Sequence, residues 1–165
     1  MIVIGVDPGT ARTGYGIIEN DSSGNLHAIA YGVITTQPDA STEERLRIIY
    51  TQLNEIITLH QPESGAVEKL FFKKNITNAI AVGQARGVII LSLGNMGIDV
   101  SEYYPTEVKT AVTGYGAAEK RQIQTMVKAL LRLDEIPQPD DAADALAIAI
   151  CHINSLTTKN LTQAG

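Results

Sequence analysis

Apolar residues near the start of the chain follow the pattern of β-strands. Residues 2–6 form a short run rich in β-branched side chains that ends at the turn sequence Asp7-Pro8-Gly9, which predicts a buried strand. Two more strands are predicted at residues 14–19 and 26–35, on either side of the polar, turn-rich segment 20–25. Three strands in succession predict an antiparallel meander.

Helical and strand patterns alternate in the rest of the chain. Ser41 and Glu44 have the spacing of a capping box at the start of a helix that ends near His60, before Pro62. Residues 65–68 predict a short buried strand that ends in a charge. The remaining predicted elements are a helix at residues 77–96, a strand at 99–104, and helices at 105–113, 119–133 and 141–154.

This order of elements predicts an α/β fold in which helices flank a mixed five-stranded sheet. The chain has no internal repeat and no low-complexity tract, so we expect one domain over residues 1–154. Residues 155–165 are rich in Thr, Asn and Gln, and we expect a flexible tail there. Gly83 and Gly87, four residues apart in a predicted helix, would permit close contact with another helix or subunit.

Composition narrows the class of protein. The chain has 165 residues, of which 44% are hydrophobic, enough for one compact core. The N-terminal segment has no basic region before Asp7, and the longest apolar run, residues 87–93, is too short to span a bilayer. We therefore expect a soluble, cytoplasmic protein. The single cysteine, Cys151, excludes an intrachain disulfide, and its apolar helical surroundings favour a core residue.

Four carboxylates lie at the ends of predicted elements. Asp7 and Glu68 each end a buried strand, where ligand sites collect in α/β sheets and an unpaired charge is costly. Asp141 and Asp144 share one face of the first turn of a helix. Singly, these acids have structural explanations: a turn, a salt bridge at the rim, or a favourable helix dipole. Because Asp140 is already available as a helix cap, a bound cation better explains the pair that follows it.

The types of ligand indicate which cation would bind. Carboxylates without nearby Cys or His favour Mg²⁺, with Mn²⁺ as a substitute, over zinc. Two such ions roughly 4 Å apart can support hydrolysis of a phosphodiester. The net charge of −5 argues against a nucleic-acid substrate. However, setting the four acids aside reduces 18 acids to 14 against 13 bases, so the remaining surface is nearly neutral.

Several separated motifs together resemble the RuvC family of Holliday junction resolvases. They are Ile4-Gly5-Val6-Asp7-Pro8-Gly9-Thr10, Thr13-Gly14-Tyr15-Gly16, Ala66-Val67-Glu68 followed by Phe71, Gly83-Gln84-Ala85-Arg86-Gly87, Gly116-Ala117-Ala118-Glu119-Lys120, and Asp141-Ala142-Ala143-Asp144-Ala145-Leu146-Ala147. This resemblance spans nearly the whole chain. It implies an RNase H-like fold, a homodimer, and paired symmetric nicks in opposing strands of four-way DNA junctions during recombination and repair.

The resemblance also assigns roles to residues. It implies that Asp7, Glu68, Asp141 and Asp144 are the catalytic acids that bind two Mg²⁺ ions. Lys109 and Lys120 match the basic residues of the family near the scissile phosphate, and we count Lys120 as catalytic because a cation there would stabilise developing charge. On its own, Lys109 in a helix would be interpreted as an ordinary solvated charge.

Aromatic and basic residues that follow the strand at 65–68 complete the predicted DNA contacts. Phe71 matches the family position that stacks on or wedges between bases at the junction, and its neighbours Lys73 and Lys74 suit unstacked DNA. Burial of both Phe71 and Phe72 under a loop is the alternative. Because this chain is acidic and its tail carries only Lys159, we expect salt-sensitive junction binding or dependence on a partner, for which the resemblance implies RuvA and RuvB.

Three other interpretations remain open at this point. The main one is another RNase H-like nuclease that acts on branched DNA or RNA–DNA hybrids. Asp7-Pro8-Gly9-Thr10 also looks like the phosphate loop of actin-like ATPases, but those proteins need a second domain of similar design and a second glycine-rich loop. A junction-binding module that has lost catalysis is disfavoured because all four acids are present.

Overall fold

The computed structural model of the chain describes residues 1–69 and 76–163. In chain order, its elements are β1 (Ile2–Asp7), β2 (Arg12–Asn20), β3 (Leu26–Thr35), α1 (Thr42–His60), β4 (Ser64–Glu68), α2 (Ile76–Asn95), β5 (Asp99–Tyr103), α3 (Pro105–Thr113), α4 (Lys120–Leu130) and α5 (Asp140–Gln163). The predicted order of strands and helices is therefore confirmed. The predicted cap of α1 is also present, since the Ser41 hydroxyl accepts a hydrogen bond from the Glu44 amide.

The five strands form one mixed sheet in the order β3-β2-β1-β4-β5. β1 pairs antiparallel with β2, and β2 with β3, which confirms the meander. β4 runs parallel to β1, and β5 runs parallel to β4. Because β1 and β4 are parallel neighbours with Val6 opposite Val67, their last residues, Asp7 and Glu68, lie at the same edge of the sheet.

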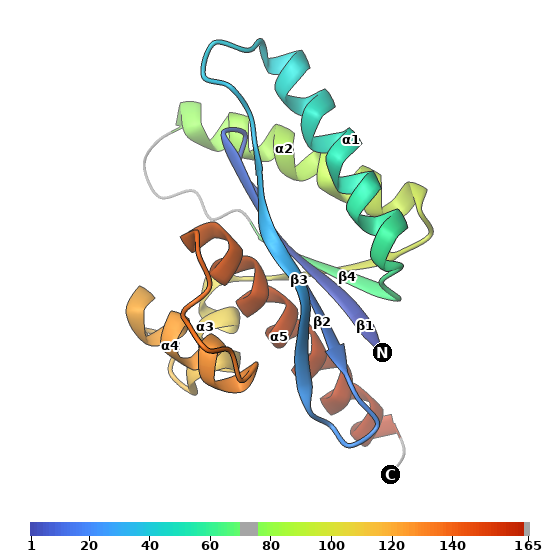
Figure 1. Ribbon diagram of the computed structural model, residues 1–165, viewed down its shortest axis with the longest axis vertical. Coiled ribbons are helices and arrows are strands. Elements are labelled where there is room, and N and C mark those ends of the chain that lie inside the picture. Colours follow the sequence, from blue (N-terminus) through green and yellow to red (C-terminus); the bar gives the residue numbers. More distant parts are fainter. Residues whose placement is uncertain (70–75, 164–165) are drawn as a thin grey trace.

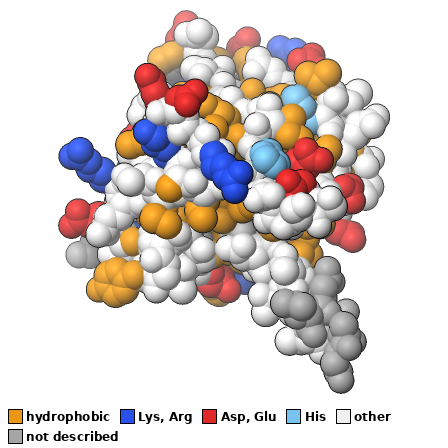
Figure 2. All heavy atoms as spheres, turned by 60° about the horizontal axis from the view of Figure 1, so that its bottom comes forward, with side chains coloured by type: hydrophobic (Ala, Val, Ile, Leu, Met, Phe, Trp, Pro, Cys, Tyr) orange, Lys and Arg blue, Asp and Glu red, His pale blue; other side chains and the backbone are white. Residues whose placement is uncertain are grey.

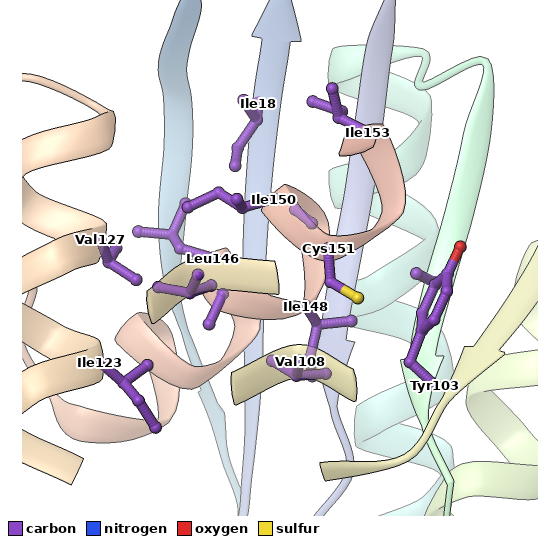
Figure 3. Packing of buried hydrophobic residues seen from close by; sticks show 14 of the residues in the cluster. Ile18, Tyr103, Val108, Ile123, Val127, Leu146, Ile148, Ile150, Cys151 and Ile153 are labelled. Atoms are coloured by element: carbon purple, nitrogen blue, oxygen red, sulfur yellow. The ribbon is translucent and has the colours of Figure 1, made fainter. Parts of the chain in front are cut away.

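Helices cover both faces of the sheet (Figure 1). α1 and α2 pack on one face, where Ile4, Ile17 and Leu53 belong to one buried hydrophobic cluster. α3, α4 and α5 pack on the other, around a second cluster that Figure 3 shows from close by. Cys151 is buried in this second cluster, so its prediction as a core residue is confirmed. None of the described helices combines the length and apolar character needed to cross a membrane.

Glycines in β1 and β2 bring α5 directly onto the backbone of the sheet. A Cβ atom at Gly5 would collide with the Ala145 carbonyl oxygen, and one at Gly14 would collide with the Asp141 carbonyl oxygen. Gly14 lies opposite Asp7 in the β1–β2 pairing. The close approach at Gly14 therefore places the start of α5, with its aspartates, next to the end of β1.

Because α5 packs so closely on Gly5, even a methyl group at this position should destabilise the fold. We expect Gly5→Ala to lower the free energy of unfolding by about 1–3 kcal/mol, because its methyl group would push against α5. The matched control is Gly94→Ala in α2, where a Cβ would meet nothing within 4 Å. Urea denaturation followed by circular dichroism measures both. Equal losses for the two variants would contradict the close packing of α5.

Two predicted helix ends are wrong. α5 continues to Gln163 instead of ending at residue 154, and threonine hydroxyls at Thr157 and Thr158 donate to carbonyls one turn back, so the polar residues continue the helix. α4 ends at Leu130 instead of residue 133, because the chain leaves the helical conformation at Arg132, whose φ is 53°. The single domain over residues 1–154 and the flexibility of 155–165 stay predictions.

Candidate active site

A cavity of about 250 Å³ opens where β1 and β4 end. Side chains from both strands and from α3, α4 and α5 line it: Asp7, Glu68, Pro105, Val108, Lys109, Lys120, Ile123, Asp144 and Ala147. The structure thus brings together three of the four predicted acids and both predicted active-site lysines. Asp141 is not part of this lining, and Phe71, Lys73 and Lys74 lie outside the described residues.

Asp7 has the most strongly altered acidity in the site. Burial at the end of β1 raises the pKa of Asp7 to about 8, and the neighbouring charges of Glu68, Asp144 and Asp141 add to this rise. The charge of Lys120 acts in the opposite direction. Asp7 therefore holds its proton to a much higher pH than an exposed aspartate does.

The same surroundings raise the pKa values of the other two acids in the cavity, Glu68 and Asp144. Burial, followed by the charge of Asp144, raises the pKa of Glu68 to about 6, while Lys109 opposes the rise. Burial also raises the pKa of Asp144, against the effect of Lys120. The carboxylates are close enough to disfavour each other's ionisation, so a positive charge between them would be stabilising.

Lys120 links α4 to α5 at the mouth of the cavity. Its Nζ lies 3.2 Å from Asp140 Oδ2 and 3.2 Å from Asp144 Oδ2. The Gln124 amide donates a further hydrogen bond of 2.9 Å to Asp140 Oδ1. Asp140, which the sequence offers as a helix cap, has its carboxylate turned toward α4 instead. Lys109 reaches the cavity from α3, where its charge acts on Glu68.

Arg12 contacts the fourth acid and is not among the residues predicted from the sequence. Its Nε lies 2.9 Å from Asp141 Oδ2, and the Arg12 side chain is 49% exposed. Arg12 is the first residue of β2, five positions after Asp7 and on the strand that pairs with β1. The available signal was a basic residue directly after the turn that follows Asp7. The contact itself depends on where α5 docks.

The donor set of the cavity fits a divalent cation. Asp7, Glu68 and Asp144 offer only oxygen atoms, which Mg²⁺ and Mn²⁺ prefer, and their mutual repulsion would be relieved by a metal. Within residues 1–69 and 76–163, no three acidic, histidine or cysteine side chains already surround one point as ligands. Instead, Lys120 holds Asp144 and Arg12 holds Asp141.

Lys and Arg side chains are scattered on one face of the molecule. On the face that Figure 2 shows, Lys and Arg side chains stand apart from one another among acidic and hydrophobic ones and form no continuous basic patch there. The whole chain carries a net charge of −5. Tight binding of a polyanion would therefore depend on a few well-placed cations near the cavity, and on bound metal, more than on a broad electrostatic surface.

Comparisons with known proteins point to one family. The sequence model of the family described as crossover junction endodeoxyribonuclease RuvC matches residues 3–152. A protein of that name from Heliobacterium modesticaldum is 54% identical over 157 residues, which are 95% of this chain and 96% of that protein. Another from Desulforamulus reducens is 56% identical over 153 residues, which are 92% of this chain and 93% of that protein.

Solved structures agree with the sequence comparisons. RuvC from Thermus thermophilus superimposes with a TM-score of 0.88 at 34% identity, over 96% of this chain and 97% of that one. The structure of T. thermophilus RuvC in complex with a Holliday junction substrate gives a TM-score of 0.84 at 32% identity, over 93% of each chain. The yeast mitochondrial Holliday junction resolvase Ydc2 shares the fold, with a TM-score of 0.62 at 15% identity.

Proposed function

The chain belongs to the RuvC family of crossover junction endodeoxyribonucleases, and we propose that it resolves Holliday junctions by making paired symmetric nicks in opposing strands of four-way DNA junctions. It has the RNase H-like fold of the family and is a structure-specific DNA hydrolase. The observation that carries the proposal is the cavity in which Asp7, Glu68 and Asp144 meet Lys109 and Lys120.

Nucleases of this family depend on a metal, and we assign the metal to four side chains of this chain. Asp7, Glu68, Asp141 and Asp144 would hold two Mg²⁺ ions, with Mn²⁺ as a substitute. Bound there, the ions would supply an activated water and neutralise charge at the phosphodiester. The raised pKa values of Asp7 and Glu68 support the assignment, because buried carboxylates that repel one another are the groups that a cation stabilises.

The two lysines of the cavity would act on the DNA phosphate. Lys109 and Lys120 approach the acids from α3 and α4, so each can donate hydrogen bonds to a phosphate oxygen that enters between them. A fixed ammonium group stabilises the negative charge that develops on that phosphate during cleavage. Val108 and Ile123 also line the cavity, and apolar surroundings of this kind strengthen charge interactions.

We propose that α2 forms the homodimer that paired nicking requires. Ile80, Gln84, Gly87 and Leu91 are exposed along one side of this helix at spacings of four, three and four residues. Ile80 is 60% exposed and Leu91 is 55% exposed, so two large apolar side chains lie on the same side of α2. At Gly87, where no atom lies within 4 Å of a Cβ position, a second copy of the helix could approach closely.

The dimer proposal predicts that a charge on this side of α2 produces monomers. Leu91→Glu is expected to dissociate the protein at micromolar concentration, because it would bury two carboxylates in a symmetric apolar contact. Sedimentation velocity measures the mass of the particle. The control is Leu59→Glu in α1, where the leucine is 76% exposed and the same charge should leave the dimer intact. A Leu91→Glu variant that remains dimeric would place the interface elsewhere.

The proposed substrate can be tested directly against the main alternative. We expect the protein to nick a synthetic four-way junction symmetrically with Mg²⁺, and to leave a linear duplex and an RNA–DNA hybrid uncut. A chelator should stop the reaction. Denaturing gels of end-labelled strands measure the position and symmetry of the cuts. Preferential cleavage of the hybrid would instead support another RNase H-like nuclease.

The remaining assignments concern contacts beyond the cavity. We propose that Phe71, Lys73 and Lys74 contact unpaired DNA at the junction, in keeping with their place directly after the strand that carries Glu68. We also propose the branch-migration proteins RuvA and RuvB as partners. The nearly neutral surface supports a partner, because few lysines and arginines are available to hold DNA without one.

A further inference from the structure

The two acids at the start of α5 form ion pairs with different basic side chains. Asp144 lines the cavity and contacts Lys120, which also lines it. Asp141 lies outside the lining, and its Oδ2 is 2.9 Å from Arg12 Nε. Lys120 therefore contacts an acid that faces the cavity, Asp144. Arg12 contacts an acid that lies outside the cavity lining, Asp141.

We propose that Arg12 competes with the divalent cation for Asp141, so that it is a positioning residue that sets how tightly the site binds metal. While this ion pair is formed, Arg12 neutralises Asp141, which lies outside the cavity lining that contains Asp7 and Glu68. Metal binding then requires Asp141 to exchange one cation for another. This inference rests on the proposed role of Asp141 as a metal ligand.

The contact is suited to such an exchange. The side chains of Arg12 and Asp141 are 49% and 29% exposed, so water can solvate both charges when they separate. Exposed ion pairs of this kind contribute little stability and break easily.

Removal of the Arg12 side chain should leave the fold intact. Arg12 is an exposed residue at the first position of β2. The next residues are held in the sheet, because Thr13 pairs with β3 and Gly14 pairs with both β1 and β3. In the described part of the chain, its side chain makes one ion pair, the one with Asp141. A change in metal binding by an Arg12 variant would therefore report on that contact.

Metal binding to the DNA-free protein tests the proposal without reference to cleavage. We expect Arg12→Gln to bind Mn²⁺ roughly two- to fivefold more tightly than the wild type, measured by electron paramagnetic resonance of the free ion at constant ionic strength. Arg12→Lys should stay close to the wild type, because it restores a cation beside Asp141. The control is Arg47→Gln in α1, on the opposite face of the sheet, which should not change the affinity.

A double-mutant cycle separates the contact from a general effect of charge. Loss of any positive charge near a metal site tightens binding somewhat, so Arg12→Gln is also made in an Asp141→Asn background. If Arg12 acts through Asp141, its replacement should have little effect there. An equal gain in both backgrounds would overturn the proposal, and so would weaker Mn²⁺ binding by Arg12→Gln, which would make Arg12 a group that orients the ligand.

The outcome also distinguishes this proposal from the proposed function. If the wild type nicks four-way junctions but Arg12→Gln binds Mn²⁺ with unchanged affinity, the competition is wrong and the function stands. If Asp141→Asn binds Mn²⁺ as tightly as the wild type, Asp141 is not a ligand and the competition fails with it. If the wild type binds Mn²⁺ and shows the predicted cycle but does not cut junctions, the competition holds and the proposed function fails.

Discussion

Replacement of Asp7 by Asn is expected to abolish Mg²⁺-dependent nicking of a four-way junction and to preserve binding of the junction. The carboxyl group of Asp7 lies at the end of β1 and interacts with the charges of Glu68 and Asp144, so its ionised form would be the central ligand of a bound metal. Asparagine has nearly the same shape but cannot supply that charge. Since a catalytic metal contributes several kcal/mol to the reaction, we expect a rate loss of at least about a thousandfold.

Single-turnover cleavage and a binding assay together measure this prediction. Binding is followed by fluorescence anisotropy of a labelled junction in chelator, where no variant can cut. The matched control is Asp99→Asn at the first residue of β5, which lies opposite Ser64 and therefore at the far edge of the sheet from Glu68. Asp99→Asn should cut normally. Residual nicking by Asp7→Asn near the wild-type rate would refute the role of Asp7, and failure of both variants would point to a general effect of charge.

The acids of the site could be predicted from the sequence because they lie at the ends of predicted strands and at the start of a predicted helix. The β-branched run before Asp7 and the short buried run before Glu68 mark two strand ends, and their charged last residues stand out because buried strands rarely carry charge. The spacing of Asp141 and Asp144 places them on one side of a helix without any knowledge of the fold. These signals depend only on residues close together in the chain.

The cations that hold these acids could not be predicted in the same way. Lys120 contacts Asp140 and Asp144 across the α4–α5 packing, and Arg12 meets Asp141 only because α5 docks on the glycines of β2. A long, flexible basic side chain at the surface has many possible partners, and the sequence does not specify which one is near. Such contacts follow from tertiary packing, which a pattern of a few residues does not contain.

The last turns of α5 also depend on context that local propensity does not describe. Threonine, asparagine and glutamine are weak helix formers or neutral ones, so residues 155–163 were expected to leave the helix. In the structure, the helix is already nucleated by the buried residues of α5 that precede them, and the added turns need only extend it. The hydroxyls of Thr157 and Thr158 donate to carbonyls one turn back, so these polar side chains find hydrogen-bond partners within the helix.

Stability of the metal-free protein is expected to fall as the pH rises from about 5.5 to about 8.5. The folded protein raises the pKa of Asp7 from 3.8 to about 8 and that of Glu68 from 4.5 to about 6, so it binds more protons than the unfolded chain within this range. Stability from these two acids is complete below their unfolded pKa values and is lost as the pH rises through the folded ones. We expect a loss of about 1–3 kcal/mol, the scale for an uncompensated buried polar or charged group.

Thermal unfolding in chelator at a series of pH values measures this effect. Asp7→Asn should remove most of the decline, because an amide has no proton to lose, and it should be more stable than the wild type at pH 8.5. Asp99→Asn, whose side chain is exposed at the start of β5, should keep the wild-type decline. A wild-type protein that becomes more stable with rising pH would contradict the buried, mutually repelling acids.

Addition of Mg²⁺ should reverse the decline in the wild type. Metal binding requires ionised carboxylates, so the ion competes with the protons that the cavity holds at low pH. Saturating Mg²⁺ is therefore expected to raise the melting temperature more at pH 8.5 than at pH 5.5, and hardly at all in Asp7→Asn. The pH series and the Mg²⁺ titration together show whether the clustered acids form a metal site or only repel one another. If pH changes stability and Mg²⁺ does not, the acids repel one another without forming a metal site, whereas both effects are required of carboxylates that bind the catalytic metal.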